Sequence, residues 1–104
     1  ARTLHGRHGC AVIVTGGHGR SAADTLCDGD GPVEIPGVRL PRPTTHGAGC
    51  THSSTLATLL AAGVPLREAA ARAKRIASGA VAGGRPFGAG AGPVDVTRAE
   101  EAIA

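Results

Sequence analysis

The sequence is poor in large side chains. Its 104 residues include one aromatic residue, Phe87, and no Trp, Tyr or Met. Leu, Ile, Val and Phe together number 20, whereas Ala alone contributes another 20 residues and Gly 17. Folding costs roughly 1–2 kcal/mol of backbone entropy per residue, and Ala and Gly bring little apolar area to offset it. We therefore do not expect this chain to be a self-sufficient fold.

Several functional classes are disfavoured by other absences. No apolar run approaches the roughly 18 residues of a membrane span. The sequence has three cysteines, which cannot all pair with one another, so we expect a reducing cytoplasm rather than a disulfide scaffold. Ten Arg and one Lys are spread along the chain with almost no aromatic residues to stack on bases. Neither nucleic acid nor a membrane is therefore expected as a partner.

Short apolar runs separated by glycine turns indicate strands in the first third of the chain. The run CAVIV, residues 10–14, is β-branched and stops at a glycine turn, which is typical of a buried strand in a parallel α/β sheet. The sequence DGDG at residues 28–31 is a strong turn signal between two short stretches, 25–27 and 33–35. These two stretches predict a hairpin or flap.

Helical patterns dominate the rest of the chain. Residues 51–62 contain neither Gly nor Pro and predict a helix that is buried on at least one side. The apolar residues between 66 and 81 recur at three- and four-residue steps, which predicts a second, amphipathic helix. This helix is expected to begin at Pro65, a favoured first residue, and to end at Gly83.

The most informative motif is THGAGCT, residues 45–51, just before the first predicted helix. The N–H groups of a helix's first turn have no partner within the helix, and small residues let a ligand approach them. The helix dipole favours negative charge there, so such a turn suits phosphate. A cysteine at this position, here Cys50, would be able to accept a proton from an attacking hydroxyl group. The alternative is a simple glycine turn with Cys50 as a small core residue.

A second motif, VTGGH at residues 14–18, follows the first predicted strand. Ligands of open α/β sheets bind beyond the carboxyl ends of the strands, and Gly16 and Gly17 would let the backbone approach a phosphate or a nucleotide ring. Taken alone, an ordinary glycine turn is the simpler interpretation of this motif.

Together these motifs resemble the C-terminal part of the hydroxymethylpyrimidine and phosphomethylpyrimidine kinases of thiamine biosynthesis. These kinases belong to the ribokinase-like superfamily and are close relatives of bacterial pyridoxal kinases. The resemblance runs from about Val12 to Val94 and takes in VIVTGGH, AADTLCDG, TTHGAGCTHSSTLATLLAAG, AAARAKRIASGAV and a tail ending in GPV. It implies the C-terminal portion of a three-layer α/β/α fold with an incomplete central sheet. Residues 1–104 would then be a partial kinase domain that holds the ATP-binding and anion-hole half.

The resemblance implies roles for particular residues by their position. Gly47, Ala48 and Gly49 would form the anion hole for the transferred phosphoryl group, and Cys50 would be the general base. The residues implied to lie along the nucleotide are Thr15, Gly16, Gly17, His18, Asp24 and Lys74. Many family members have lysine where Thr15 stands, and a solvated helix lysine is the alternative interpretation of Lys74.

The resemblance also implies ATP and Mg²⁺, because phosphoryl transfer needs its charge neutralised; the sequence does not show which residues would bind the metal. The implied substrate is hydroxymethylpyrimidine or its monophosphate, with pyridoxal as an alternative. Since the family's fold is more than twice as long, a missing N-terminal half would carry the pyrimidine pocket. We expect that half, a second copy of the chain or a partner chain to complete the site; another alternative is a non-catalytic remnant or split subunit.

Two other patterns are weaker. The His and Cys residues within 5–10 and 46–52 are of the types that zinc prefers. However, the sequence has no Cys-x-x-Cys pair, and His52 would point away from Cys50 on a helix. The run GAGAG imitates a dinucleotide-binding fingerprint, but no predicted strand precedes it and Pro93 follows, so it is not interpreted as one.

Overall fold

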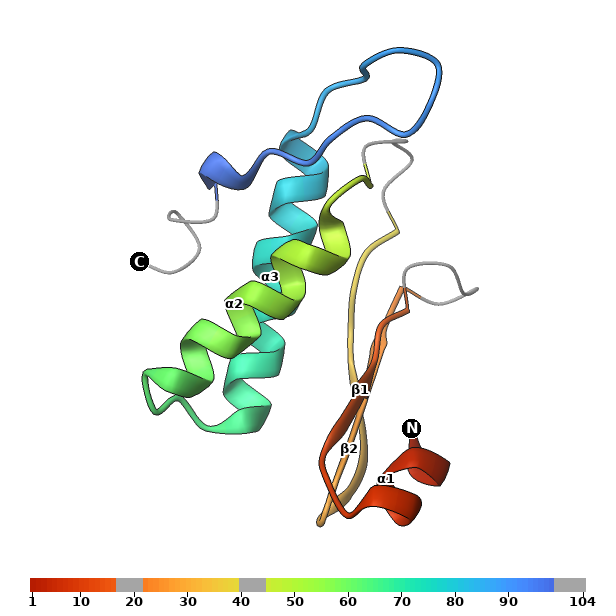
Figure 1. The fold of residues 1–104 in the computed structure, drawn as a ribbon, viewed down its shortest axis with the longest axis vertical. Coiled ribbons are helices and arrows are strands. Elements are labelled where there is room, and N and C mark those ends of the chain that lie inside the picture. Colours follow the sequence, from red (N-terminus) through yellow and green to blue (C-terminus); the bar gives the residue numbers. More distant parts are fainter. Residues whose placement is uncertain (17–21, 40–44, 99–104) are drawn as a thin grey trace. The chain divides into compact units, whose positions relative to one another are not determined.

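The computed structural model describes residues 1–16, 22–39 and 45–98. The chain divides into two compact units, Ala1–Arg39 and Leu40–Ala104. The first unit contains a short helix, α1 (Arg2–His8), and a small sheet, and the second contains two long helices (Figure 1). The α/β class expected from the sequence is confirmed, and each unit is described by itself.

The sheet of the first unit has three antiparallel strands in the order β1–β2–β3. Their bounds are Val12–Val14 for β1, Asp24–Asp28 for β2 and Gly31–Ile35 for β3. The predicted hairpin is confirmed as β2 and β3. Its turn depends on Gly31, whose φ of 93° is readily adopted only by glycine, and on the Asp30 N–H, which donates to Asp28 Oδ1 at 2.9 Å.

The expectation of a parallel sheet around residues 10–14 is wrong for the described strands. β1 pairs antiparallel with β2, in a register that places Val14 opposite Thr25. A parallel pair needs a crossover of about a dozen residues or more, and the connection from Val14 to Asp24 is shorter. β1 is also less buried than predicted, since Val14 is 45% exposed. The buried apolar side chains of this unit instead belong to β2 and β3 and are Leu26, Cys27 and Ile35.

The second unit consists of α2 (Ala48–Ala61), α3 (Leu66–Gly83) and a short 3-10 helix, η1 (Val96–Arg98). Both predicted long helices are confirmed, with shifted beginnings. α2 begins three residues earlier than predicted. Pro65 is the N-cap of α3 rather than its first helical residue, because its ψ of 144° is extended. α3 ends at Gly83, as predicted.

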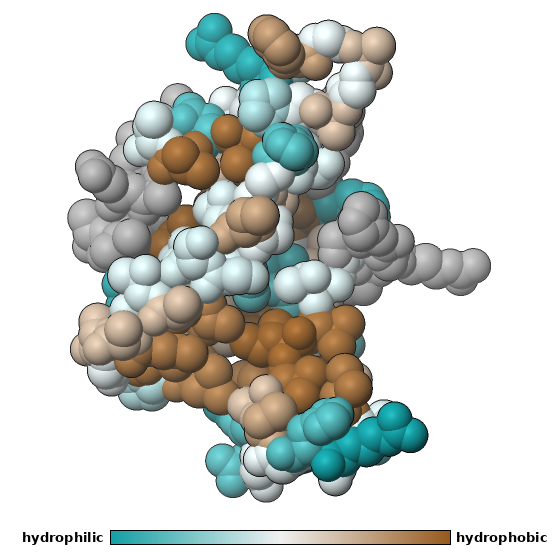
Figure 2. Space-filling view, in the orientation of Figure 1, coloured by the Kyte–Doolittle hydropathy of each residue, from teal (hydrophilic) through white to brown (hydrophobic). Residues whose placement is uncertain are grey.

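α2 and α3 pack against each other (Figure 1). The apolar stripe predicted for α3 is confirmed in its middle part, while Leu66 and Val81 at its two ends are half-buried. Its buried residues are Ala69, Ala70, Ala73, Ile76, Ala77 and Ala80. Alanine side chains let two helices approach closely. Among the described residues of this unit, the large aliphatic side chains that are buried are Ile76 of α3 and Leu59 of α2. In Figure 2 the surface along α2 is mostly pale and turns brown toward its C-terminal end. That end includes Leu60, which is 42% exposed.

The burial of Ile76 leads to a stability prediction. Ile76 is 1% exposed, so Ile76→Ala should lower the free energy of unfolding by about 2–5 kcal/mol, because it leaves a cavity beside α2. Leu60→Ala, on the exposed part of α2, should change it by less than about 1 kcal/mol. Urea unfolding of the two variants measures both values, and similar losses would contradict this packing.

Candidate active site

The motif around Cys50 forms the start of α2. Gly47 is the N-cap of the helix and adopts φ 91° and ψ 1°, a left-handed conformation that residues with a Cβ atom rarely reach. A Cβ atom at this position would also lie 3.3 Å from Val94 Cγ2. The backbone conformation is thus the main reason for glycine here, and the tight approach to Val94 adds to it.

The hydrogen bonds of this turn leave two donors available. The Ala48 N–H donates to Thr45 O at 3.1 Å, and the Thr51 N–H donates to Gly47 O at 2.9 Å. The Thr51 hydroxyl donates to the same Gly47 oxygen at 2.7 Å and fixes that peptide group further. Within the described ranges, no acceptor is recorded for the N–H groups of Gly49 and Cys50. Donors of this kind at a helix N-terminus can bind an anion.

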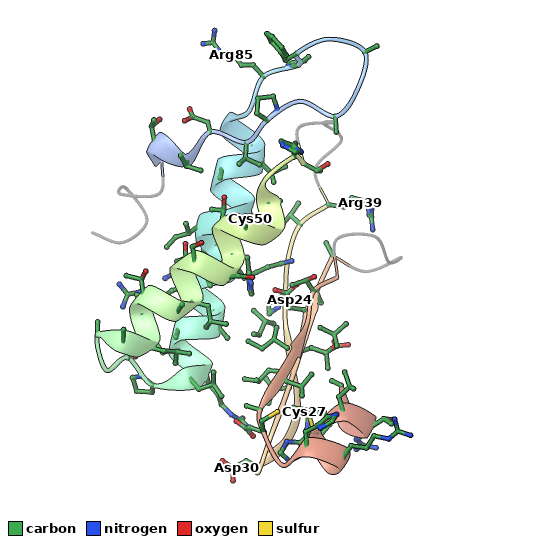
Figure 3. The ribbon with its side chains drawn as sticks, in the orientation of Figure 1. Asp24, Cys27, Asp30, Arg39, Cys50 and Arg85 are labelled. Atoms are coloured by element: carbon green, nitrogen blue, oxygen red, sulfur yellow. The ribbon has the colours of Figure 1, made fainter. Side chains whose placement is uncertain are left out.

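Cys50 lies in this first turn as a free, exposed thiol (Figure 3). His52, two residues further along α2, is only 6% exposed, so the two side chains face different surroundings. Among the residues that the structure describes, no three His, Cys, Asp or Glu side chains are grouped as metal ligands would be. Cys50 is thus an exposed thiol in the same helical turn as the Gly49 and Cys50 amides, and a thiol in such a turn can take part in acid–base chemistry at a bound anion.

A segment that follows α3 holds this turn in place. The His46 N–H donates to Gly92 O at 3.1 Å, and the Val94 N–H donates to His46 O at 3.0 Å. The Asp95 N–H then donates to Ala80 O at 2.9 Å, which ties the same segment to α3. The start of α2 is thus fixed by backbone pairing with residues more than forty positions away.

Gly92 is the residue of this segment that sequence reasoning missed. A Cβ atom at Gly92 would lie 2.5 Å from the Arg85 carbonyl oxygen and 3.1 Å from Pro86 Cα. Only glycine lets the chain pass so close to residues 85–86 and still reach His46. Its only sequence signal is its place in a glycine-rich tail, which does not reveal the partner.

The first unit contains most of the residues that the family resemblance implies to lie along the nucleotide. Thr15 is exposed, and Gly16 follows it just beyond the end of β1. The Gly16 N–H donates to Asp24 Oδ1 at 3.0 Å, and Asp24 is completely buried at the start of β2 (Figure 3). The structure thus brings Thr15, Gly16 and Asp24 together. Gly17 and His18 lie outside the described residues.

Lys74 lies in the middle of α3 and is half-buried. It belongs to the same unit as Cys50. Its implied place beside the adenine or ribose stays a prediction.

The sequence of this chain is similar to those of known kinases. A family model described as phosphomethylpyrimidine kinase matches residues 1–95. The chain belongs to the phosphomethylpyrimidine kinase family. A thiamine biosynthesis bifunctional protein of Geobacter sulfurreducens is 42% identical over 99% of this chain and 21% of its own length. A hydroxymethylpyrimidine/phosphomethylpyrimidine kinase of Rhizobium meliloti is 43% identical over 81% of this chain and 33% of its own length.

Solved structures of related kinases have a backbone fold similar to that of this chain. An ADP complex of Bacillus subtilis pyridoxal kinase has a TM-score of 0.78 and 32% identity, covering 88% of this chain and 35% of that one. A Staphylococcus aureus pyridoxal kinase in complex with ADP has a TM-score of 0.76 and 29% identity, covering 83% and 32%. The ribokinase-like fold expected from the sequence is thereby confirmed. The chain spans about a fifth to a third of the length of these family relatives.

The close contact at Gly92 leads to a second stability prediction. Gly92→Ala should lower the free energy of unfolding by about 1–3 kcal/mol, because the added methyl group meets backbone atoms that cannot move aside cheaply. Gly90→Ala is the matched control, since nothing lies within 4 Å of its added Cβ atom. Denaturant unfolding should show little change for Gly90→Ala or a slight gain. Equal losses in the two variants would contradict the contact.

Proposed function

We propose that this chain is the anion-hole and nucleotide half of a kinase that transfers the γ-phosphoryl group of ATP to hydroxymethylpyrimidine or to its monophosphate. The main support is the first turn of α2, where the amides of Gly49 and Cys50 and an exposed thiol occur together in a chain of this family. Since ATP is the phosphoryl donor, we place the reaction in the cytoplasm. The rest of the substrate pocket comes from a further part of the protein or from another chain.

In this proposal, Cys50 Sγ accepts the proton of the substrate's attacking hydroxyl or phosphate oxygen. That oxygen forms a bond to the γ-phosphorus while the bond from phosphorus to the β–γ bridging oxygen breaks, and ADP leaves with the bonding electrons. The turn Gly47–Ala48–Gly49 begins the helix, and the N–H groups of Gly49 and Cys50 donate to the equatorial oxygens, which carry the negative charge of the transition state. The Ala48 N–H already donates to Thr45 O and is not one of these donors. Because these donors are fixed before the reaction, little reorganisation is needed.

The nucleotide is proposed to lie along Thr15, Gly16, Gly17 and His18, with Lys74 at the adenine or ribose edge. Thr15 is exposed just beyond the end of β1, so its hydroxyl group is accessible to a phosphate. Mg²⁺ bound to ATP would supply charge neutralisation. None of the described residues is assigned as its ligand.

A pyridoxal kinase is the second candidate function. It is favoured by the solved relatives, both of which are pyridoxal kinases bound to ADP. The two functions share the base and the anion hole, so they differ in the acceptor alone. Comparing kcat/KM for hydroxymethylpyrimidine, its phosphate and pyridoxal in the full-length protein that contains these residues decides between them.

Removal of the proposed base tests the mechanism. Cys50→Ala should lower kcat about 10²–10⁴-fold, the usual contribution of general acid–base catalysis. The dissociation constant for ATP should stay close to that of the wild type, because the backbone donors are unchanged. Turnover by coupled assay and ATP binding by calorimetry measure the two quantities.

Cys10→Ala provides the matched control, since Cys10 is also a free, exposed cysteine but lies outside the motif. Its turnover should equal that of the wild type. Full turnover in Cys50→Ala would remove Cys50 from the role of base. No turnover by the wild-type protein with any of the three acceptors would instead favour a non-catalytic remnant or a split subunit.

A further inference from the structure

The end of the β1–β2 ladder is completed by a side chain instead of the backbone. The last backbone pair joins Val14 to Thr25. The amide of Gly16, two residues further along, donates to the side-chain oxygen Oδ1 of Asp24 at 3.0 Å. The carboxylate of Asp24 therefore determines where the chain goes as it leaves β1.

The position of this carboxylate is itself fixed. Asp24 pairs through β2 with Ile35 of β3, so its main chain is held by the hairpin. Its side chain is completely buried, and burying a carboxylate is costly unless hydrogen bonds compensate it. The hydrogen bond from the Gly16 N–H is one such bond, and it also fixes where that N–H group lies.

The backbone around Gly16 fits closely against the segment before β2. A Cβ atom at Gly16 would collide with the carbonyl group of Ala23. The chain at residues 15–16 is thus restrained both by this contact and by the hydrogen bond to Asp24. Together they give the Thr15–Gly16 peptide one position.

We propose that Asp24 is a positioning residue that acts through the Gly16 N–H and fixes the place of the Thr15–Gly16 turn beside the nucleotide. This inference rests on the proposed function, and it changes the role implied for Asp24 from nucleotide contact to support of the turn. A buried carboxylate whose Oδ1 already accepts a backbone hydrogen bond is poorly suited to approach an anionic phosphate.

Two substitutions of Asp24 in the full-length protein separate position from charge. Asp24→Asn keeps an oxygen acceptor in the same place but removes the charge, whereas Asp24→Ala removes the acceptor. We expect ADP to bind Asp24→Asn within about threefold of the wild type and Asp24→Ala about tenfold or more weakly, as expected for loss of a charged hydrogen bond. Calorimetry measures ADP binding, and the ¹⁵N–¹H shift of Gly16 reports the hydrogen bond directly.

Asp28→Ala is the matched control, because Asp28 lies at the other end of β2 and accepts from Asp30 in the hairpin turn. It should leave both the ADP affinity and the Gly16 shift unchanged. Should Asp24→Ala fail to fold, Asp24→Glu takes its place, since it keeps the charge but moves it by one methylene group. The same loss of affinity is expected there.

Three results would overturn the inference. Equal weakening of ADP binding in Asp24→Asn and Asp24→Ala would mean that the charge itself contacts the ligand. Unchanged ADP binding in Asp24→Ala with a lowered melting temperature would mean a structural role alone. Failure of the wild type to bind ADP would overturn the nucleotide site and this inference together, whereas ADP binding without phosphoryl transfer would contradict the proposed reaction but not the role of Asp24.

Discussion

Backbone pairing between His46 and the segment Gly92–Val94 is the constraint on which the proposed site depends. It fixes the residues immediately before α2, where Gly47 is the N-cap of the helix in a left-handed conformation. A helix N-terminus attracts anions in general. What distinguishes this one is that its entry is held by a second segment and that an exposed thiol shares its first turn.

In the first unit the backbone is also held by a second segment, but there a side chain provides the hydrogen bond. At Gly16 the backbone runs against the segment before β2, and Asp24 supplies the hydrogen bond that the strand ladder no longer provides. In both places a glycine lets two backbone segments approach closely. The direction of the chain is then determined by a partner that is distant in sequence or lies in the next strand. The small side chains that make the sequence look poor in core thus serve to bring backbone groups together.

Local chemistry made much of this predictable. The turn at residues 28–31 predicts the hairpin, and the three- and four-residue steps predict α3. The helix after the Cys50 motif is also predicted, but α2 begins three residues earlier, inside that motif. The antiparallel pairing of β1 and the role of Gly92 were not predictable in the same way. Both depend on which distant backbone lies alongside, and neither hydrophobic pattern nor turn chemistry encodes that partner. Apart from the glycines and Cys50, the site residues implied by the family resemblance have no feature in the local sequence that marks them as ligand-binding.

The most direct test of the central claim is an amide-resolved titration of the full-length protein with ADP, Mg²⁺ and aluminium fluoride, which mimics the transferring phosphoryl group. If the first turn of α2 is the anion hole, the amide protons of Gly49 and Cys50 move downfield as the complex forms. The amide of Gly90, in the glycine-rich tail, stays in place. Saturating binding that leaves the Gly49 and Cys50 amides unmoved would contradict the account.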